Sequence, residues 1–262
     1  MTYLILSGDT SVTNKCRLAY ENLLELGTVT ASSENAEFPV ENCFDGNTAD
    51  YFKPASGGTV NIDLTLSPGR TANYFAFYAQ NLFQFGGSIK LQYHNGADYV
   101  DATSGISPSD NAPRILFFDD TTATQWRIVV TCSSVFSLGM VSFGEFLPLQ
   151  HGMYRDWTPP VLGRANTLLN SVSDSGAFLG RSIIAKGIQT TVKLQYAADS
   201  WVRDEWLTFV KHAEQKPFWF APNVDAYPNE VALCWTDGDI PAPVHTHYGY
   251  MGVDVPIRGL VE

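Results

Sequence analysis

Charged residues are scarce in this chain. Asp, Glu, Lys and Arg make up 16% of its 262 residues, whereas a typical soluble domain carries about a quarter. Basic residues are the scarcer kind, with 16 Lys and Arg against 27 Asp and Glu and a formal net charge of −11. A surface with this balance is unsuited to wrapping a phosphate backbone. It suits a channel through which DNA slides, and the shortage of charge indicates that partners cover much of the surface.

Long apolar runs and paired cysteine motifs are also missing. No stretch approaches the ~18 apolar residues of a membrane helix, so we expect no membrane insertion. The first ten residues, MTYLILSGDT, lack the basic segment of a secretory signal, and we expect synthesis in a cytoplasm. The chain has four widely separated cysteines and no CxxC pair, which argues against a zinc knuckle and favours free thiols. They are Cys16, Cys43, Cys132 and Cys234.

Recognisable catalytic motifs are absent too. The sequence contains no GxSxG elbow, P-loop or HExxH motif. His245 and His247 would face the same side of a strand, but no third metal ligand follows, so we favour a polar strand edge. Asp237 and Asp239 flank a glycine without the later Glu of a calcium loop, which favours a plain turn. We therefore predict that the protein is not an enzyme; a glycan-active enzyme is the weakest alternative.

The part of the chain before residue 148 contains short strand-like runs separated by Gly, Ser, Asn and Pro. Residues 88–93 alternate strictly, with Ile89, Leu91 and Tyr93 on one face. Similar runs occur at 62–66 and 124–131. This pattern predicts an antiparallel β-sandwich over residues 28–148. Residues 1–27 are assigned to an N-terminal segment that belongs to the second domain or serves as a linker.

The pattern changes after Pro148, where a proline-rich crossing leads to SDSGAFLGRS, a predicted β-hairpin or long loop. A strand follows at 188–196, and then an amphipathic helix at about 200–215. Asp199 or Ser200 is the predicted N-cap, and Pro217 ends the helix. One stripe of this helix is apolar: Val202, Trp206, Phe209, Val210 and Ala213. Further strands follow. The sequence therefore predicts a mainly β protein whose second domain, 149–262, is a sheet with one packed helix.

The segment Phe38–Pro54 places a tight turn between apolar anchors. Asp45-Gly46 forms the turn, with Gly46 free to take positive φ, and aromatic residues on either side can enter the core. Asp45, Asn47 and Asp50 could also offer oxygen atoms to calcium. On the residues alone, a structural corner is favoured over a calcium site.

This segment resembles the start of a discoidin-like, galactose-binding-like (F5/8 type C-like) domain. The matching residues are Ala31-Ser32-Ser33, Pro39, Asn42, Cys43-Phe44, Asp45-Gly46, Thr48 and Phe52, and the runs VNIDLTL, IKLQYHNGADYV, TQWRIVV and VSFGEF extend the match over about 28–147. The family usually has Trp where this chain has Phe52. The resemblance implies a jelly-roll sandwich with candidate sugar-binding loops at 45–52 and 81–85. The candidate carbohydrate contacts are Tyr51, Phe52, Asn81 and Phe83, and the candidate calcium ligands are Asp45, Asn47 and Asp50.

The second half is similar to the tail-tube-like domain shared by tube and distal tail proteins of long-tailed phages (siphophages). The similarity rests on the order strands–helix–strands and on the segments ANTLLNSVSDSGAFLGRSI and KPFWFAPN. It implies a hexameric ring around the DNA path, with tail tube and tail tip proteins as partners and a place in the virion. DNA would pass through the lumen without specific binding.

The leading hypothesis is accordingly a structural virion protein, the distal tail or baseplate hub ring of a long-tailed phage. The alternative is a carbohydrate-binding minor tail protein that contacts a glycan on the host surface. No cofactor is expected beyond the candidate calcium ion.

Overall fold

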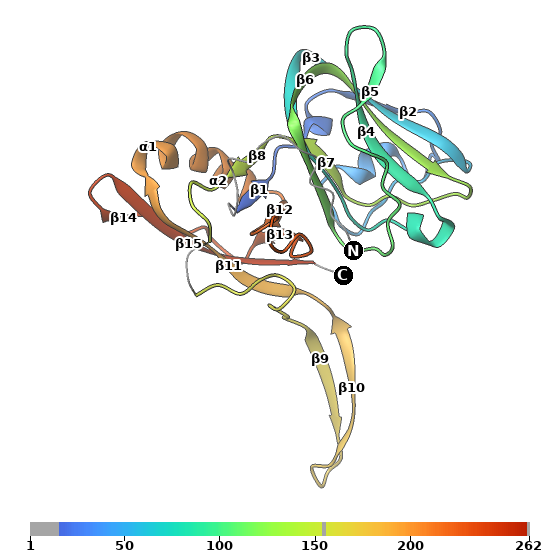
Figure 1. Ribbon diagram of the computed structural model, residues 1–262. Coiled ribbons are helices and arrows are strands. Elements are labelled where there is room, and N and C mark those ends of the chain that lie inside the picture. The colour runs from blue at the N-terminus through green and yellow to red at the C-terminus, as the bar shows by residue number, and fades with distance from the viewer. Residues whose placement is uncertain (1–15, 154–155, 261–262) are drawn as a thin grey trace.

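The computed structural model describes residues 16–153 and 156–260, and these form two β modules lying side by side (Figure 1). The mainly β, antiparallel architecture predicted from the sequence is confirmed. The first ten residues, from which the absence of a secretory signal was argued, lie outside the described residues. Within the described residues, no helix combines the length and apolar character that crossing a membrane requires.

The first module is a β-sandwich with strand order β2-β3-β6-β4-β5, in which β7 also pairs with β3. Two register shifts interrupt the long β3–β6 ladder, one between Thr65 and Arg70 and one between Ala72 and Tyr74. The strands are β2 (Thr28–Ala31), β3 (Gly58–Phe77), β4 (Ser88–His94), β5 (Tyr99–Asp101), β6 (Arg114–Cys132) and β7 (Val141–Gly144), with short 3-10 turns η2 (Leu23–Glu25), η3 (Val40–Cys43) and η4 (Leu82–Phe85).

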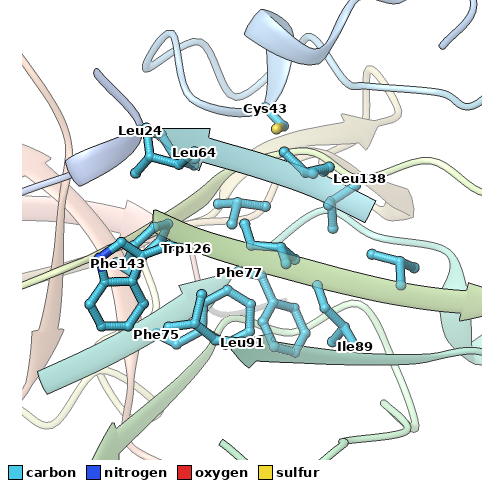
Figure 2. Packing of buried hydrophobic residues seen from close by; sticks show 14 of the residues in the cluster. Leu24, Cys43, Leu64, Phe75, Phe77, Ile89, Leu91, Trp126, Leu138 and Phe143 are labelled. Carbon is cyan, nitrogen blue, oxygen red and sulfur yellow. The ribbon is translucent and has the colours of Figure 1, made fainter. Parts of the chain in front are cut away.

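Alternation along these strands builds the core of the sandwich. Ile89 and Leu91 on β4 and Trp126 on β6 are buried, together with Phe75 and Phe77 from the second half of β3 (Figure 2). Each fully buried side chain of this size contributes about 1.5–3 kcal/mol relative to exposure. The predicted anchors also enter this core: Phe52 is fully buried and Phe44 packs partly against it.

The second module is a seven-stranded antiparallel sheet with strand order β11-β15-β13-β12-β1-β8, and β14 pairs with β15. Its strands are β1 (Arg17–Ala19), β8 (Phe146–Pro148), β11 (Ile188–Ala198), β12 (Phe218–Ala221), β13 (Ala232–Thr236), β14 (Val244–His247) and β15 (Tyr250–Leu260). The strands β1 and β8 therefore lie in this sheet, although the predicted boundary at 148 places β8 in the sandwich.

One helical segment covers a face of the second sheet, as predicted. It comprises α1 (Asp199–Trp201), the π-helical turn η5 (Val202–Trp206) and α2 (Leu207–Ala213). The predicted stripe faces the sheet, with four of its residues buried and Val210 partly buried. The predicted N-cap is wrong: the N-cap position is Ala198, without a side-chain hydrogen bond, because the helix begins directly at the end of β11.

The two modules share a third apolar core. Tyr74 and Phe117 from the sandwich pack in one cluster with Trp219 and Leu233 from the second sheet. Tyr74 also donates a hydrogen bond of 2.6 Å from its hydroxyl to the carbonyl oxygen of Glu21. The modules are thus joined by a packed interface, in addition to the two places where the chain passes between them, from β1 to β2 and from β7 to β8.

A two-stranded hairpin projects away from both modules (Figure 1, bottom). It consists of β9 (Thr167–Val172) and β10 (Phe178–Ala185), which among the described strands pair only with each other. We call residues 167–185 the arm.

Candidate functional site

The two loops predicted to bind carbohydrate meet at one edge of the sandwich, which we call the rim. Phe52 and Leu138 exchange backbone hydrogen bonds of 2.9 and 3.0 Å. On the other side of the same segment, the amide of Ser137 donates to Oδ1 of Asn81 at 2.7 Å, and the amide of Asn81 donates to Ser137 O at 3.3 Å. The loops at 45–52 and 81–85 are therefore both hydrogen-bonded to the same short segment, residues 137–138.

Tyr51 forms the most sugar-compatible surface of the rim. Its ring stacks on Phe38 with a centroid distance of 5.0 Å and an interplanar angle of 11°. The Lys53 ammonium group lies 4.7 Å from the Tyr51 ring centroid and 4.4 Å from that of Phe38. All three side chains are half-buried. This cluster combines an apolar ring surface with nearby hydrogen-bond donors.

The prediction that Phe52 contacts a sugar is wrong. Its side chain has no exposed surface and packs edge-on to Phe136 with a centroid distance of 6.2 Å. Phe83 is half-buried on η4, while Phe85 on the same turn is 40% exposed. The sequence pattern does not single out Phe85, because the phase of a short 3-10 turn cannot be read from so few residues.

The three predicted calcium ligands do come together, but they bind each other. Oδ1 of Asp45 accepts from the amide of Asn47 at 2.8 Å, and Nδ2 of Asn47 donates to Oδ2 of Asp50 at 2.7 Å. The first contact is an Asx turn and the second is a hydrogen bond between side chains, and together they account for the corner without a metal. Across residues 16–153 and 156–260, no group of three or more His, Cys, Asp or Glu is arranged to hold a metal ion. Calcium binding at this loop stays a prediction.

The same loop forms one wall of a groove between the modules. The groove has a volume of about 430 Å³ and is lined by residues 46–48 of the loop, by residues 213–217 at the end of α2, and by Trp235 and Thr236 on β13. Trp235 is 38% exposed. Sequence analysis missed this groove because it depends on how the two modules pack together.

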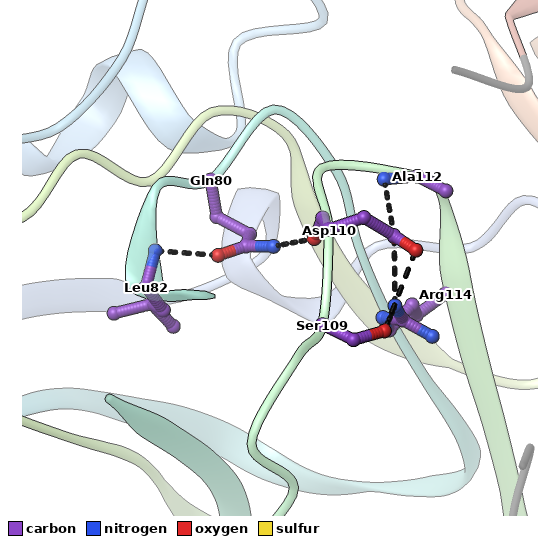
Figure 3. A network of polar contacts seen from close by, with 6 residues as sticks. All are labelled: Gln80, Leu82, Ser109, Asp110, Ala112 and Arg114. Atoms are coloured by element: carbon purple, nitrogen blue, oxygen red, sulfur yellow. Dashed lines mark hydrogen bonds and ion pairs between the residues drawn. The ribbon is translucent and has the colours of Figure 1, made fainter. Parts of the chain in front are cut away.

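A polar network fixes the loop beside the rim (Figure 3). Gln80 donates from Nε2 to the carbonyl oxygen of Asp110 at 2.5 Å and accepts at Oε1 from the amide of Leu82 at 2.6 Å. The Asp110 carboxylate accepts from the Arg114 guanidinium at 2.8 Å and from the amide of Ala112 at 3.0 Å. Because these groups bind one another, the network fixes residues 80–82 of the rim relative to the loop at 109–114.

The remaining sequence candidates lie on β14 and in the turn after β13. His245 and His247 are both exposed on β14, and a register shift lies between their pairings with β15. Asp237 accepts from Nε2 of Gln189 at 3.1 Å and forms an ion pair with Nε of Arg258 at 2.8 Å. These contacts fit the predicted strand edge and turn.

The arm is the most unusual exposed feature of the molecule. Its large apolar side chains are 40–67% exposed, and they lie on both strands: Leu168, Leu169, Val172, Phe178, Leu179, Ile183 and Ile184. Arg181 is the only charged residue on the two strands, and its Nε donates to Oδ1 of Asn170 at 2.6 Å. The sequence suggests a hairpin or long loop here, but not that it projects away from the body.

No protein-family model matches the chain, and no curated protein matches it. Among solved structures, CpGH89CBM32-5 from Clostridium perfringens, in complex with GalNAc-β-1,3-galactose, is 17% identical, with a TM-score of 0.42 over 48% of this chain and 100% of that one. Chitosan-binding module 2 of a chitosanase/glucanase from Paenibacillus sp. IK-5, in complex with chitotriose, is 18% identical, with a TM-score of 0.41 over 47% of this chain and 100% of the module. A pectin binding carbohydrate binding module is 17% identical, with a TM-score of 0.39 over 46% of this chain and 91% of that one. These neighbours are carbohydrate-binding modules that match about half of the chain, and the likeness assigns neither a ligand nor a reaction to this protein.

Proposed function

We propose that the protein is an architectural protein that assembles with copies of itself through the arm and carries the β-sandwich as a rigid attachment. The exposed arm is the observation that carries this proposal. A two-stranded hairpin alone in water is marginally stable. Here the hairpin also exposes seven large apolar side chains, whose burial against a partner would stabilise both the hairpin and the assembly.

The second sheet supports a channel-lining role within such an assembly. Its helix-covered face is apolar, whereas the opposite face carries polar and charged side chains along residues 189–193 of β11 and 254–258 of β15. On that face Nζ of Lys193 lies 2.9 Å from Oδ2 of Asp254, and Arg258 is paired with Asp237. Because both cations are neutralised by carboxylates, this surface would not retain DNA phosphates.

We further propose that the assembly is a hexameric distal tail or hub ring of a long-tailed phage, located in the virion between the tail tube protein and tail tip proteins. This identity rests on the resemblance of the second half to tail-tube-like domains. The proposed role is non-enzymatic. Negative-stain imaging of the purified chain tests it: closed rings with a central channel support the proposal, and particles of single-copy size at high concentration contradict it.

Carbohydrate binding by the rim is the second candidate function. The stacked Tyr51 and Phe38 rings with Lys53 beside them favour it. A glycan array is the direct test, with Tyr51→Ala and Phe83→Ala as rim variants. Tyr227→Ala is the matched control, since Tyr227 is 58% exposed and lies outside the rim. Binding that the rim variants lose and the control keeps supports this role, and silence across the array argues for a purely architectural sandwich.

A further inference from the structure

A second exposed apolar surface lies at the far end of the strand pair from which the arm emerges. We call it the tyrosine patch, and its members are Tyr196, Val244, Tyr248 and Tyr250, which are 49%, 62%, 96% and 43% exposed. We propose that the arm of one copy docks on the tyrosine patch of the next copy. This inference rests on the proposed self-assembly and specifies the receiving surface.

The ladder between β11 and β15 places the two surfaces at opposite ends. The arm is tied to the start of β11, where the amide of Ala165 donates to Gly187 O at 2.9 Å and Ile188 pairs with Gly259. The patch lies where Ala198 pairs with Tyr250. With a rise of ~3.3 Å per residue, the strand separates the two ends by about 30 Å. Figure 1 shows the same relation, with β14 at one end of the ladder and the arm leaving near the other.

Two residues of the patch lie on the same face of the sheet, and the other two lie in the adjoining turn and in a register shift. Residues directly opposite each other in an antiparallel pair share a face. Val244 pairs with Gly252, which lies two residues from Tyr250, so Val244 and Tyr250 face the same side. Tyr196 sits in the register shift of β11, with a positive φ of 55°, and its side chain is exposed beside Ala198. Left-handed backbone at a non-glycine residue is costly and is retained where the surrounding structure demands it.

The chemistry of the two surfaces is complementary. The arm brings one apolar face, on which Phe178 is paired with Val172 and Ile183 with Leu168, and a single cation, Arg181. The patch brings tyrosine rings, which are enriched at protein interfaces and accept cations over their faces. The arm also carries Asp174 in its connecting loop, so it has no net charge and can approach another copy of this chain, whose net charge is −11, without the repulsion that an acidic hairpin would meet.

Two different surfaces on one molecule make a head-to-tail contact, which closes into a ring or extends as a filament. An arm-to-arm contact would instead stop at a dimer. The geometry thus selects the kind of association that the proposed ring requires.

Mixing experiments with the full-length chain separate these arrangements. The arm variant carries Phe178→Ser and Ile183→Ser, and the patch variant carries Tyr248→Ser and Tyr250→Ser. Leu207→Ser is the control for the patch variant, since Leu207 is 43% exposed outside both surfaces. Mass photometry reports the particle sizes, and circular dichroism checks that each variant is folded.

We expect each variant alone to be monomeric, the control to assemble, and an equimolar mixture of the two variants to form 1:1 heterodimers. The heterodimer is the decisive species. The patch variant keeps an intact arm and the arm variant keeps an intact patch, so the two variants can form one contact with each other and no further contact. If the patch variant assembles like the native chain while the arm variant does not, the docking site is wrong and the proposed self-assembly stands. If the native chain is itself monomeric, both fail.

Discussion

Trp219 on β12 donates a hydrogen bond of 2.6 Å from Nε1 to the hydroxyl oxygen of Ser142 on β7. The two residues lie 77 positions apart and belong to different modules. Both are buried, and Ser142 also lies 3.2 Å from the Tyr74 hydroxyl. The sandwich and the second sheet are therefore linked by a specific buried polar contact within their shared core.

Replacing Ser142 by Ala should destabilise the whole chain. The substitution leaves the buried indole N–H of Trp219 without its acceptor, which costs about 1–3 kcal/mol. Urea unfolding followed by tryptophan fluorescence measures the change. Ser200→Ala, at an exposed helix position, is the matched control. A Ser142→Ala variant as stable as the control would show that the modules are not coupled through this contact.

All four cysteines should resist thiol reagents in the folded protein. Each is buried and unpaired, and burial raises the pKa of the Cys16, Cys43 and Cys234 thiols well above the ordinary range. Since the thiolate is the reactive form, labelling should be negligible until the chain unfolds. Ellman's reagent with and without guanidinium tests this. A rapidly labelled thiol in the native protein would contradict the packing described for its core.

His212 should make stability depend on pH near neutrality. Burial lowers the pKa of this side chain, whose Nε2 lies 3.1 Å from the carbonyl oxygen of Pro217. The hydrogen bond with Pro217 and the charge of Glu25 raise the pKa, and Lys216 adds to the lowering, with burial the largest effect. Below the unfolded value of about 6.5, the unfolded chain binds a proton that the folded chain resists, so the free energy of unfolding falls as pH falls.

Thermal unfolding at pH 7.5 and at pH 5.5 tests this, with His212→Gln as the comparison. We expect the native chain to lose more stability than the variant over this interval. An equal loss in both proteins would mean that His212 does not contribute to the fall in stability between pH 7.5 and pH 5.5.

Calcium should leave the stability of the protein unchanged if the corner at Asp45–Asp50 is purely structural. An Asx turn already uses the Asp45 side chain, and a hydrogen bond from the Asn47 side chain uses that of Asp50. Thermal unfolding in excess calcium and in excess EDTA should therefore give the same midpoint. A midpoint raised by calcium, and no longer raised in Asp50→Asn, would instead establish the calcium site that the family resemblance implies.

Local pattern was enough to predict the strands, the amphipathic helix and the anchoring of Phe44 and Phe52, because alternation and helical periodicity report directly on burial. The role of Phe52 as a sugar contact failed for the same reason, since a residue that anchors the core has no surface left for a ligand. One position cannot serve both purposes.

What the sequence did not reveal depends on contacts between distant segments. The groove beside Trp235 exists only because residues 46–48 meet the end of α2. The pairing of β1 with β8 joins residues about 130 positions apart, which no local periodicity encodes. The arm reads as an ordinary strand pair in sequence, and only its isolation in space shows that its apolar residues lack a core.

The central claim is that copies of this chain associate through the arm, and light scattering coupled to size exclusion measures it most directly. The comparison is between the native chain, the Phe178→Ser and Ile183→Ser arm variant, and a Ser171→Ala and Ser182→Ala control within the same hairpin. We predict a multi-copy native species, an equally large control and a monomeric arm variant. A native chain that elutes as a monomer of 28.9 kDa, or an arm variant as large as the control, would contradict the account.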